Sequence, residues 1–367
     1  SSAILARFLR ACGREPRIYI PDRMKEGYGP NADGLARLAA EGVKLVCVLD
    51  SGTVAFEPLK AGKEAGLDII VIDHHAAEEQ LPEAVAIVNP NRLDQEKGYG
   101  HVCAAGMTFI FCVATMMVLR EKAFFVQAGR REPDLMRYLD LVALGTVADV
   151  VPLIGLNRAF VRRGLEIMSG REKPGFAALA RVSGRNGEPV RGALESHHCG
   201  FAFGPRINAG GRVGEADAGA RLLASDDVRE CEDLANRLDE WNAERKEIER
   251  LCLEEAHQQI GSLDERSGVL LAWGEGWHEG VVGIIASRLK DAYDLPTFVF
   301  SVKDGIAKGS GRSLPGFNLG AAVIAARQKG ILTKGGGHAM AAGVTLPVDH
   351  LETFKAFLDK AVSTSDF

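Results

Sequence analysis

The stretch Asp68-Ile69-Ile70-Val71-Ile72-Asp73-His74-His75 carries an unbroken apolar run that ends in a carboxylate and two imidazoles. A short run rich in β-branched residues is typical of a strand buried on both faces of a parallel sheet. The run Val43 to Leu49 has the same character and ends in Asp50. We therefore expect two parallel strands that each finish in an acidic residue at the same end of the sheet.

The residue types at these strand ends favour a divalent metal site. Carboxylate and imidazole ligands together suit ions such as Mn²⁺, and a strand end fixes side chains in space. Asp50 alone could equally serve as a turn or capping residue. Two adjacent histidines after a buried strand are harder to explain in that way, because buried titratable rings need partners.

Strand and helix patterns alternate around these two runs. Further strands are expected at 17–20 and 84–88, and helices at 32–41, with Asn31 as the N-cap, and at 54–65. This alternation predicts β-α-β units with a parallel sheet. Helical periodicity continues over 104–119 and 134–148, whereas the stretch after Gly184 is expected to be rich in loops.

The composition changes in the second part of the chain. Residues 226–266 hold 14 acidic and 6 basic residues with apolar residues at helical spacing, which predicts a long amphipathic connector helix. A second α/β pattern follows, with strands at 269–273, 297–301 and 344–346 and helices at 280–293, 319–328 and from 351. We therefore predict one domain at 1–225, the connector at 226–266 and a smaller domain at 267–367.

Length and composition narrow the possible classes of protein. A chain of 367 residues exceeds what one hydrophobic core usually supports, and 46% hydrophobic with 25% charged residues is typical of a folded globular protein. The formal net charge of −5 gives no general attraction to polyanions or acidic membranes, so a polyanion site must be local or use metal ions.

Cysteine usage and hydropathy favour a cytoplasmic protein without a membrane partner. The seven cysteines are odd in number and form no Cys-x-x-Cys pair, as expected for reduced thiols. The apolar stretch Val102 to Leu119 contains polar breaks and is shorter than the roughly 20 residues of a membrane span. No signal peptide pattern is visible either.

Several glycine-rich segments are candidates for binding phosphates. Arg206, Asn208 and Arg212 fall in one such segment, where guanidinium groups could grip phosphate oxygens, although surface arginines in a turn would look the same. The segments 309–313 and 335–338 offer backbone N–H groups, the latter at an expected helix start. The stretch from Lys303 to Lys334 holds six basic residues and one acidic residue. Trp277, His278 and Phe317 could stack on bases or simply pack.

Five segments in this order resemble the DHH phosphoesterase family, specifically its RecJ-type single-strand-specific 5′ exonucleases. The segments are Ile20-Pro21-Asp22-Arg23 to Tyr28-Gly29, Val71 to His75, Gly145 to Leu153, Phe203 to Arg212 and Gly335 to Gly343. Together they extend over nearly the whole chain. The resemblance implies a parallel Rossmann-like α/β domain joined by a long helix to a smaller α/β domain that binds substrate.

The resemblance also implies roles for individual residues. Asp50, His74 and Asp149 would be direct ligands of Mn²⁺ or Mg²⁺, two ions in the complete site, with Asp73 and His75 as catalytic partners that support these ligands or contact the phosphate. Asp149 also draws attention by itself, because it follows an apolar helical run and precedes Val-Val-Pro-Leu. Substrate binding would fall to Arg206, Asn208, Arg212, Ser310, Arg312, Gly336, Gly337 and His338.

One part of the family pattern has no counterpart here. Relatives carry an Asp-x-Asp-Gly motif on a first strand, just before a helix that resembles Ser1 to Leu5. The segment Asn31-Ala32-Asp33-Gly34 has similar letters, but we interpret it as a helix cap. We therefore expect an N-terminally truncated catalytic core with an incomplete two-metal site, and no oligonucleotide-binding barrel follows within the sequence.

The expected function is metal-dependent 5′-to-3′ hydrolysis of single-stranded DNA in DNA repair and recombination. A single-strand-binding protein or a helicase would be a partner by family resemblance. Two alternatives stay open: a DHH phosphodiesterase acting on short oligonucleotides or cyclic dinucleotides, and a non-catalytic protein that binds single-stranded nucleic acid. An NAD-binding enzyme is disfavoured, because no Gly-x-Gly-x-x-Gly opens a helix after the first strand.

Overall fold

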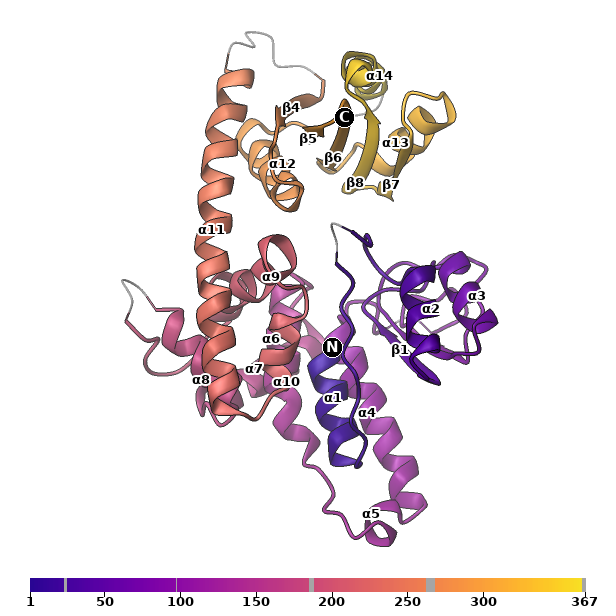
Figure 1. The fold of residues 1–367 in the computed structure, drawn as a ribbon, viewed down its shortest axis with the longest axis vertical. Helices are drawn as coiled ribbons and strands as arrows, with labels where there is room; N and C mark the ends of the chain where they lie inside the picture. The colour runs from indigo at the N-terminus through magenta and orange to yellow at the C-terminus, as the bar shows by residue number, and fades with distance from the viewer. Residues whose placement is uncertain (23–24, 97, 185–187, 262–267, 365–367) are drawn as a thin grey trace. The chain divides into compact units, whose positions relative to one another are not determined.

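The computed structural model describes residues 1–22, 25–96, 98–184, 188–261 and 268–364 (Figure 1). The chain divides into two compact units, Ser1–Asn242 and Ala243–Phe367, and the long helix α11 (Val228–Ile260) runs through the division. The boundary predicted between residues 266 and 267 and the quoted residue Arg23 lie outside the described residues. A parallel sheet in the first unit and a second sheet in the other confirm the expected α/β class.

The sheet of the first unit is parallel, with strands in the order β1-β2-β3. Its strands are β1 (Leu45–Leu49), β2 (Asp68–Ile72) and β3 (Ala86–Val88), and its flanking helices are α2 (Ala32–Ala40), α3 (Phe56–Glu64) and α4 (Ala104–Glu121). Ile69 and Val71 pack among residues of α2 and α3, whereas Ile72 packs beside Met107 of α4. Alternate residues of β2 are thus buried on opposite faces, as a doubly covered strand requires.

The rest of the first unit is helical and surrounds its largest core. The elements are α1 (Ser2–Ala11), α5 (Phe124–Gln127), the 3₁₀ helix η1 (Leu135–Tyr138), α6 (Leu139–Ala148), α7 (Gly155–Ser169), α8 (Pro174–Val182), the π-helix η3 (His198–Phe203), α9 (Gly204–Val213) and α10 (Ala218–Ala224). α6 is apolar on every side, with Leu141, Val142 and Leu144 all buried. Such a helix belongs at the centre of a core, and its end is therefore held firmly.

Two predictions for the first unit are wrong. Residues 17–20 are not a strand: Ile18 packs on the helical core, and Tyr19 packs beside α2 and donates a hydrogen bond from its hydroxyl to Glu26 Oε1 (2.6 Å). Side-chain contacts, and not hydrogen bonds between strands, therefore hold residues 17–20 in place. The segment containing Arg206 to Arg212 is not a loop but helix α9, which Pro205 can begin because a proline in the first turn removes no helical hydrogen bond.

The predicted cap of α2 is confirmed. Asn31 has an extended backbone, and its Oδ1 accepts a hydrogen bond from the N–H of Gly34 (2.7 Å). This contact is the usual way in which asparagine begins a helix. The letters Asn-Ala-Asp-Gly therefore open α2, as interpreted from the sequence.

By length and composition, α4 is the one helix among the described residues that could cross a membrane. Phe109, Cys112 and Met116 of this helix are buried in the core of the first unit. A buried core helix meets the same criteria of length and hydropathy. The absence of a membrane partner therefore stays a prediction.

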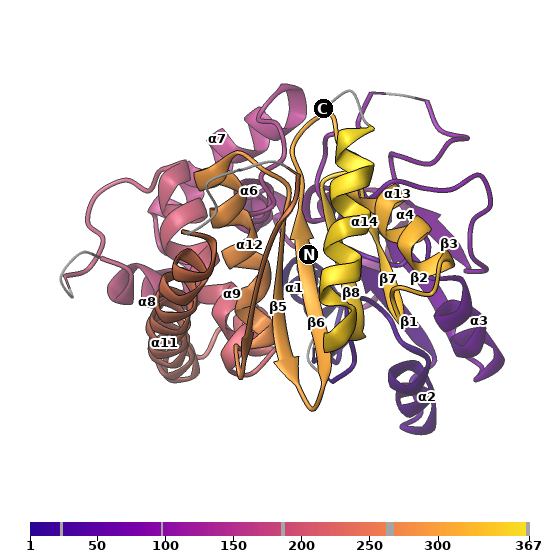
Figure 2. The same ribbon diagram turned by 90° about the horizontal axis from the view of Figure 1, so that it is seen from above.

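The second unit is a five-stranded sheet with helices on both faces (Figure 2). Its elements are β4 (Leu270–Glu275), α12 (Glu279–Tyr293), β5 (Thr297–Lys303), β6 (Ile306–Arg312), α13 (Leu319–Gln328), β7 (Lys334–His338), β8 (Ala341–Pro347), the 3₁₀ helix η4 (Val348–His350) and α14 (Leu351–Ser363). Strand order is β4-β5-β6-β8-β7, with only β4 and β5 parallel. Phe298 and Phe300 pack toward α13 and α14, whereas Val299 packs toward α12.

The two glycine-rich segments of this unit form strands, so their predicted loop geometry is wrong. Residues 309–312 belong to β6, which pairs with β5 and β8, and residues 335–338 belong to β7 and do not begin a helix. A Cβ atom on Gly309 would lie 2.4 Å from the ring of Phe300, and one on Gly311 would lie 2.5 Å from the ring of Phe298. These two glycines make room for cross-strand aromatic rings.

Candidate metal centre

Three polar residues extend the parallel ladder one step beyond the strands of the first unit. The N–H of Asp50 donates to the carbonyl of Ile72 (2.9 Å), and the N–H of Asp73 donates to the carbonyl of Val88 (3.0 Å). Asp50, Asp73 and Asn89 therefore follow β1, β2 and β3 in register, at the carboxyl end where parallel sheets gather their functional groups.

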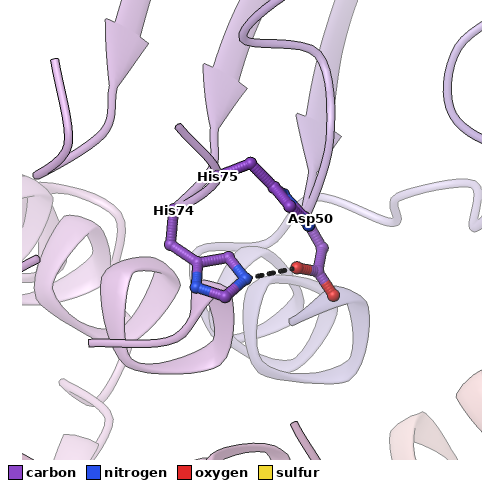
Figure 3. Close-up of side chains that lie close together, drawn as sticks. All are labelled: Asp50, His74 and His75. Atoms are coloured by element: carbon purple, nitrogen blue, oxygen red, sulfur yellow. Dashed lines mark ion pairs between the residues drawn. The ribbon is translucent and has the colours of Figure 1, made fainter. Parts of the chain in front are cut away.

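His74 lies between two carboxylates from different elements. Its Nε2 is 3.3 Å from Oδ1 of Asp50 and 3.4 Å from Oδ2 of Asp149, which caps the C-terminus of α6 (Figure 3 shows the first contact). Nε2 is buried, and the alignment is that of an ion pair without a hydrogen bond. The structure thus brings together Asp50, His74 and Asp149, which sequence reasoning had joined as ligands.

The electrostatics of the three groups are mutually dependent. Burial alone would lower the pKa of His74, but Asp50 and Asp149 outweigh it and raise the pKa above its ordinary value. Burial would raise the pKa of Asp50, but His74 and other positive groups lower it overall. Burial raises the pKa of Asp149, and the nearby charge of Asp50 adds to the increase. Without a further cation, the carboxylates therefore favour a protonated His74.

Asp73 is the most enclosed member of the group, at 1% exposure. Its Oδ2 accepts hydrogen bonds from the N–H and the hydroxyl of Thr53 (3.1 and 2.7 Å). Its Oδ1 accepts from the N–H groups of His74 and His75 (2.8 and 3.3 Å) and lies 2.7 Å from Nδ1 of His75. Although burial opposes the charged form, these contacts hold the pKa of Asp73 well below its usual range. The geometry makes Asp73 a positioning residue.

His75 is half-exposed and lies beside Asp50 and His74. Its contact with Asp73 raises its pKa, because the carboxylate stabilises the charged ring. Ligand atoms of Asp50, His74 and His75 all lie within 4.8 Å of one another (Figure 3). Because Nδ1 of His75 contacts Asp73, Nε2 is the nitrogen of this ring that can contact a metal ion or a substrate.

Sequence reasoning missed three residues that hold this group in place, namely Thr53, Asn89 and Asn91. Asn89 Nδ2 donates to Thr53 Oγ1 (2.8 Å) and to the carbonyl of His75 (2.9 Å). Asn91 Nδ2 donates to the carbonyl of His74 (2.5 Å) and to that of Gly100 (3.1 Å). A signal was present as Asn89-Pro90-Asn91 directly after a strand, because polar residues at that point face the same end of the sheet as the carboxylates.

Two residues at the centre adopt backbone conformations that non-glycine residues rarely take. Asp50 has φ 63° and Val150, next to Asp149, has φ 57°. Aspartate tolerates this region, whereas for a β-branched valine it is an outlier. The hydroxyl of Tyr28 donates to the carbonyl of Asp50 (3.1 Å) and supports that turn. Strain of this kind gathers at functional sites.

The predicted phosphate-binding residues of the first unit differ in their surroundings. Arg206 donates from Nε to Asp239 (2.8 Å) and from its two Nη atoms to the carbonyls of Ala202 and Val182 (2.9 and 3.2 Å). These contacts use its guanidinium to fix α9. Asn208 is exposed on the same helix, and Arg212 is partly buried. The substrate roles of the three residues stay predictions.

The predicted substrate residues of the second unit lie on strands β6 and β7. Arg312 Nη1 donates to Ser310 Oγ (2.9 Å) and to the carbonyl of Gly311 (2.8 Å). Gly336, Gly337 and His338 are exposed on the edge strand β7. Their roles also stay predictions.

Of the two roles left open for Trp277 and Phe317, stacking on bases or packing, the structure shows packing. Both side chains are buried in the second unit. Trp277 Nε1 donates to Glu255 (2.6 Å), and His278 caps α12 by accepting from Gly280 N–H (3.1 Å). These rings therefore pack and cap.

Comparison with known protein families shows which class of protein this chain belongs to. Residues 1–146 match the model "DHH family, N-terminal domain" and residues 266–364 match the model "DHHA1 domain". The fold and the Asp-His-His strand end are thus those of a DHH protein with a DHHA1 domain.

Relatives narrow this class further. The chain is 39% identical to "Single-stranded-DNA-specific exonuclease RecJ" of Dickeya dadantii over 97% of its own length and 62% of that protein. It superposes with a TM-score of 0.79 on a crystal structure of exonuclease RecJ bound to manganese, at 31% identity, covering 99% of this chain and 86% of the other. A manganese complex of RecJ from Thermus thermophilus also gives 0.79, at 29% identity, covering 99% and 50%. The chain belongs to the RecJ family.

Proposed function

We propose that this protein hydrolyses phosphodiester bonds of single-stranded DNA from the 5′ end, using Mn²⁺ or Mg²⁺. The observation that carries the proposal is the position of His74 Nε2, buried between the carboxylates of Asp50 and Asp149 without a hydrogen bond. Relatives named as single-stranded-DNA-specific exonucleases and the manganese in the related structures support it. The 5′ direction rests on the resemblance to that family.

The residues of the centre fit a divalent cation. Two carboxylates that face one ring nitrogen require either a proton on that nitrogen or a cation between the three groups. Asp50, His74 and Asp149 would hold the metal, and His75 lies beside them. Oxygen and imidazole donors of this kind suit Mn²⁺ and accept Mg²⁺ when oxygen dominates. Bound divalent ions supply Lewis-acid stabilisation of phosphate charge and activation of water.

The chain's own groups prepare this chemistry. Asp73 orients His75 through its contact with Nδ1 and raises the pKa of the ring, which favours its protonated form. The protonated Nε2 can then donate a hydrogen bond to a phosphate oxygen, where negative charge increases during hydrolysis. Thr53 and Asn89 hold Asp73 and the backbone of His75 in place, so little reorganisation is needed when substrate binds.

The test is a nuclease assay with Mn²⁺ on the 367-residue chain and, in parallel, on the longest reading frame that contains it. Substrates are a single strand labelled at its 5′ or its 3′ end, the matching duplex and a dinucleotide. We expect release of the 5′ label first, little cleavage of the duplex, and loss of activity with EDTA. His74→Ala should abolish hydrolysis, whereas Asp68→Asn, at the opposite end of β2, should leave it unchanged.

Three results would overturn the proposal. Cleavage of the dinucleotide alone would favour a phosphodiesterase for short substrates. Metal-independent single-strand binding without any cleavage, in both protein forms, would favour a non-catalytic binder. Undiminished turnover in His74→Ala would remove the assigned centre.

We further propose a role in DNA repair and recombination, in the cytoplasm, with a single-strand-binding protein or a helicase as partner. The partners and the role rest on the family resemblance. The location is supported by the seven cysteines, none of which forms a disulfide. Co-purification of the tagged chain from cytoplasmic extract with either partner, lost after nuclease treatment if DNA alone bridges them, is the corresponding test.

A further inference from the structure

Four large apolar side chains are exposed on two segments beside the candidate metal centre. Val150 (88% exposed), Leu153 (41%) and Ile154 (58%) follow Asp149 in the chain, and Phe201 (84%) lies on the π-helix η3. We call these four residues the apolar rim. The proposed metal chemistry gives none of them a role, and exposed apolar groups gathered at a polar site are typical of a binding surface.

The packing of η3 places the turn that carries Phe201 against the helix that supplies Asp149. A Cβ atom on Gly200 would lie 3.5 Å from Val147 Cγ1, and one on Gly204 would lie 3.5 Å from the Cβ of Ala148. Val147 and Ala148 are the two residues before Asp149, whose carboxylate is 3.4 Å from His74 Nε2. The turn that carries Phe201 therefore contacts the last turn of the helix that supplies Asp149.

The same turn is held so that Phe201 faces solvent. Its neighbours Cys199 and Phe203 are fully buried, and the ring of Phe203 packs 6.4 Å from that of Phe176. Arg206 ties the turn down by donating to the carbonyl of Ala202 (2.9 Å) while it is itself bound to Asp239. Single π-helical turns of this kind are frequent at functional sites. Phe201 is thus exposed on a turn whose neighbouring residues are buried.

Val150 gives an independent sign that this surface is functional. A β-branched residue with φ 57° carries backbone strain that a glycine or asparagine would avoid, and its side chain gains nothing from burial. Strain that is maintained directly beside a candidate ligand points to a conformation that serves binding.

We propose that Phe201 stacks on the base of the nucleotide next to the phosphate held at the metal centre. The inference rests on the proposed function, because it requires a nucleic acid strand at that centre. An aromatic ring stacks on any base, so the contact suits an enzyme that acts on single strands of any sequence. In a duplex the base is already stacked and paired, so Phe201 would select an unpaired end.

The experiment measures affinity for a single strand with nuclease-resistant linkages in Mn²⁺, so that the metal centre can be loaded while the strand stays intact. A fluorescent oligothymidine is compared with strands in which one base at a time is replaced by an abasic site. Phe201→Ala is compared with Val126→Ala, since Val126 is equally exposed (85%) but lies on α5. Stacking on one base is usually worth about 1–3 kcal/mol, so Phe201→Ala should weaken binding of the intact strand about 5- to 150-fold. Its melting temperature should match that of wild type.

The abasic strands decide the outcome. We expect one abasic position near the 5′ end at which wild type and Phe201→Ala bind equally well, because the base that Phe201 contacts is absent. Val126→Ala should behave as wild type on every strand. A Phe201→Ala loss that is the same at every abasic position, or no loss at all, overturns the inference even when wild type is an active nuclease. A position-specific loss in a chain that never cleaves DNA supports the inference and refutes the proposed hydrolysis.

Discussion

The carboxyl end of the first sheet and strand β6 of the second sheet use small and polar residues in opposite ways. After β1, β2 and β3, polar side chains bind one another, so that Asp73 alone accepts four hydrogen bonds from Thr53, His74 and His75 and has a further contact with the His75 ring. In β6, Gly309 and Gly311 have no side chains, and aromatic rings of β5 fill the space. The first region is arranged to hold ligands, and the second to pack a core.

This difference shows what each region contributes to function. A connected polar network in a buried position keeps its members in one geometry, which is what a metal centre needs. Glycines under aromatic rings make the sheet compact and leave their own N–H groups in the ladder between β5 and β8. A phosphate-binding role for β6 would therefore rest on its side chains, Ser310 and Arg312, and not on its backbone.

The largest effect should follow Asp73→Ala in the first region. The substitution leaves the buried donors of Thr53 and the N–H groups of His74 and His75 without their acceptor. We expect a loss of about 3 kcal/mol in the free energy of unfolding and no measurable hydrolysis. Urea denaturation measures the stability, with Asp68→Ala as control, since Asp68 is exposed at the start of β2. A loss below about 0.5 kcal/mol would contradict the network.

The next largest effect should follow Gly311→Val in the second region. Its Cβ would lie 2.5 Å from the ring of Phe298 and 2.8 Å from Leu319, so the core must shift. Overpacking of this kind typically costs about 1–3 kcal/mol. The matched control is Gly336→Val on β7, where a Cβ meets no atom within 4 Å, and we expect a change within about 0.5 kcal/mol. Equal stability of the two variants in thermal unfolding would contradict this account of β6.

The parts of the fold that the sequence predicted are those with strong periodicity. β1, β2, α2, α4, α11, α12 and α13 were expected close to their observed positions. β6 and β7 were missed because glycine breaks strand patterns. In β6, the glycines are explained by the rings of Phe298 and Phe300 that face them from β5. Residues 17–20 were mistaken for a strand because apolar residues were buried there without a ladder.

The candidate centre was predictable only in part. Asp50 and His74 follow strands, so their meeting could be inferred from the parallel order alone. Asp149 follows α6, and its position 3.4 Å from His74 depends on how that helix packs. The family resemblance placed Asp149 in the centre, whereas the residues alone did not. Thr53 carries no signal by type, because its contacts arise from a turn whose shape is set by the fold.

A smaller effect should follow Thr53→Val, which tests how much one member of the network contributes. The variant keeps the shape of the side chain but removes the hydroxyl that donates to Asp73 and accepts from Asn89. The N–H of residue 53 still reaches Asp73, so we expect a loss of only about 1 kcal/mol. Thr53→Ser keeps the hydroxyl and should lose less. If Thr53→Ser and Thr53→Val are equally destabilised in urea, the hydroxyl contributes nothing.

The smallest effect should be the loss of stability at alkaline pH, measured in EDTA. The folded-state pKa of His75 is raised above the ordinary 6.5, so its contribution is complete below that pH and is lost as pH rises through the folded value. The folded-state pKa of Asp73 is lowered below 3.8, so its contribution is complete above that pH and is lost as pH falls toward the folded value. Because His75 is half-exposed, solvent screens its pairing, and the alkaline loss should stay below about 1 kcal/mol.

His75→Gln should flatten the alkaline limb of the curve of stability against pH and leave most of the acid limb. An alkaline limb of unchanged slope in that variant would assign the dependence to His74, whose pKa is also raised, and would show that the Asp73–His75 pair does not stabilise the folded chain.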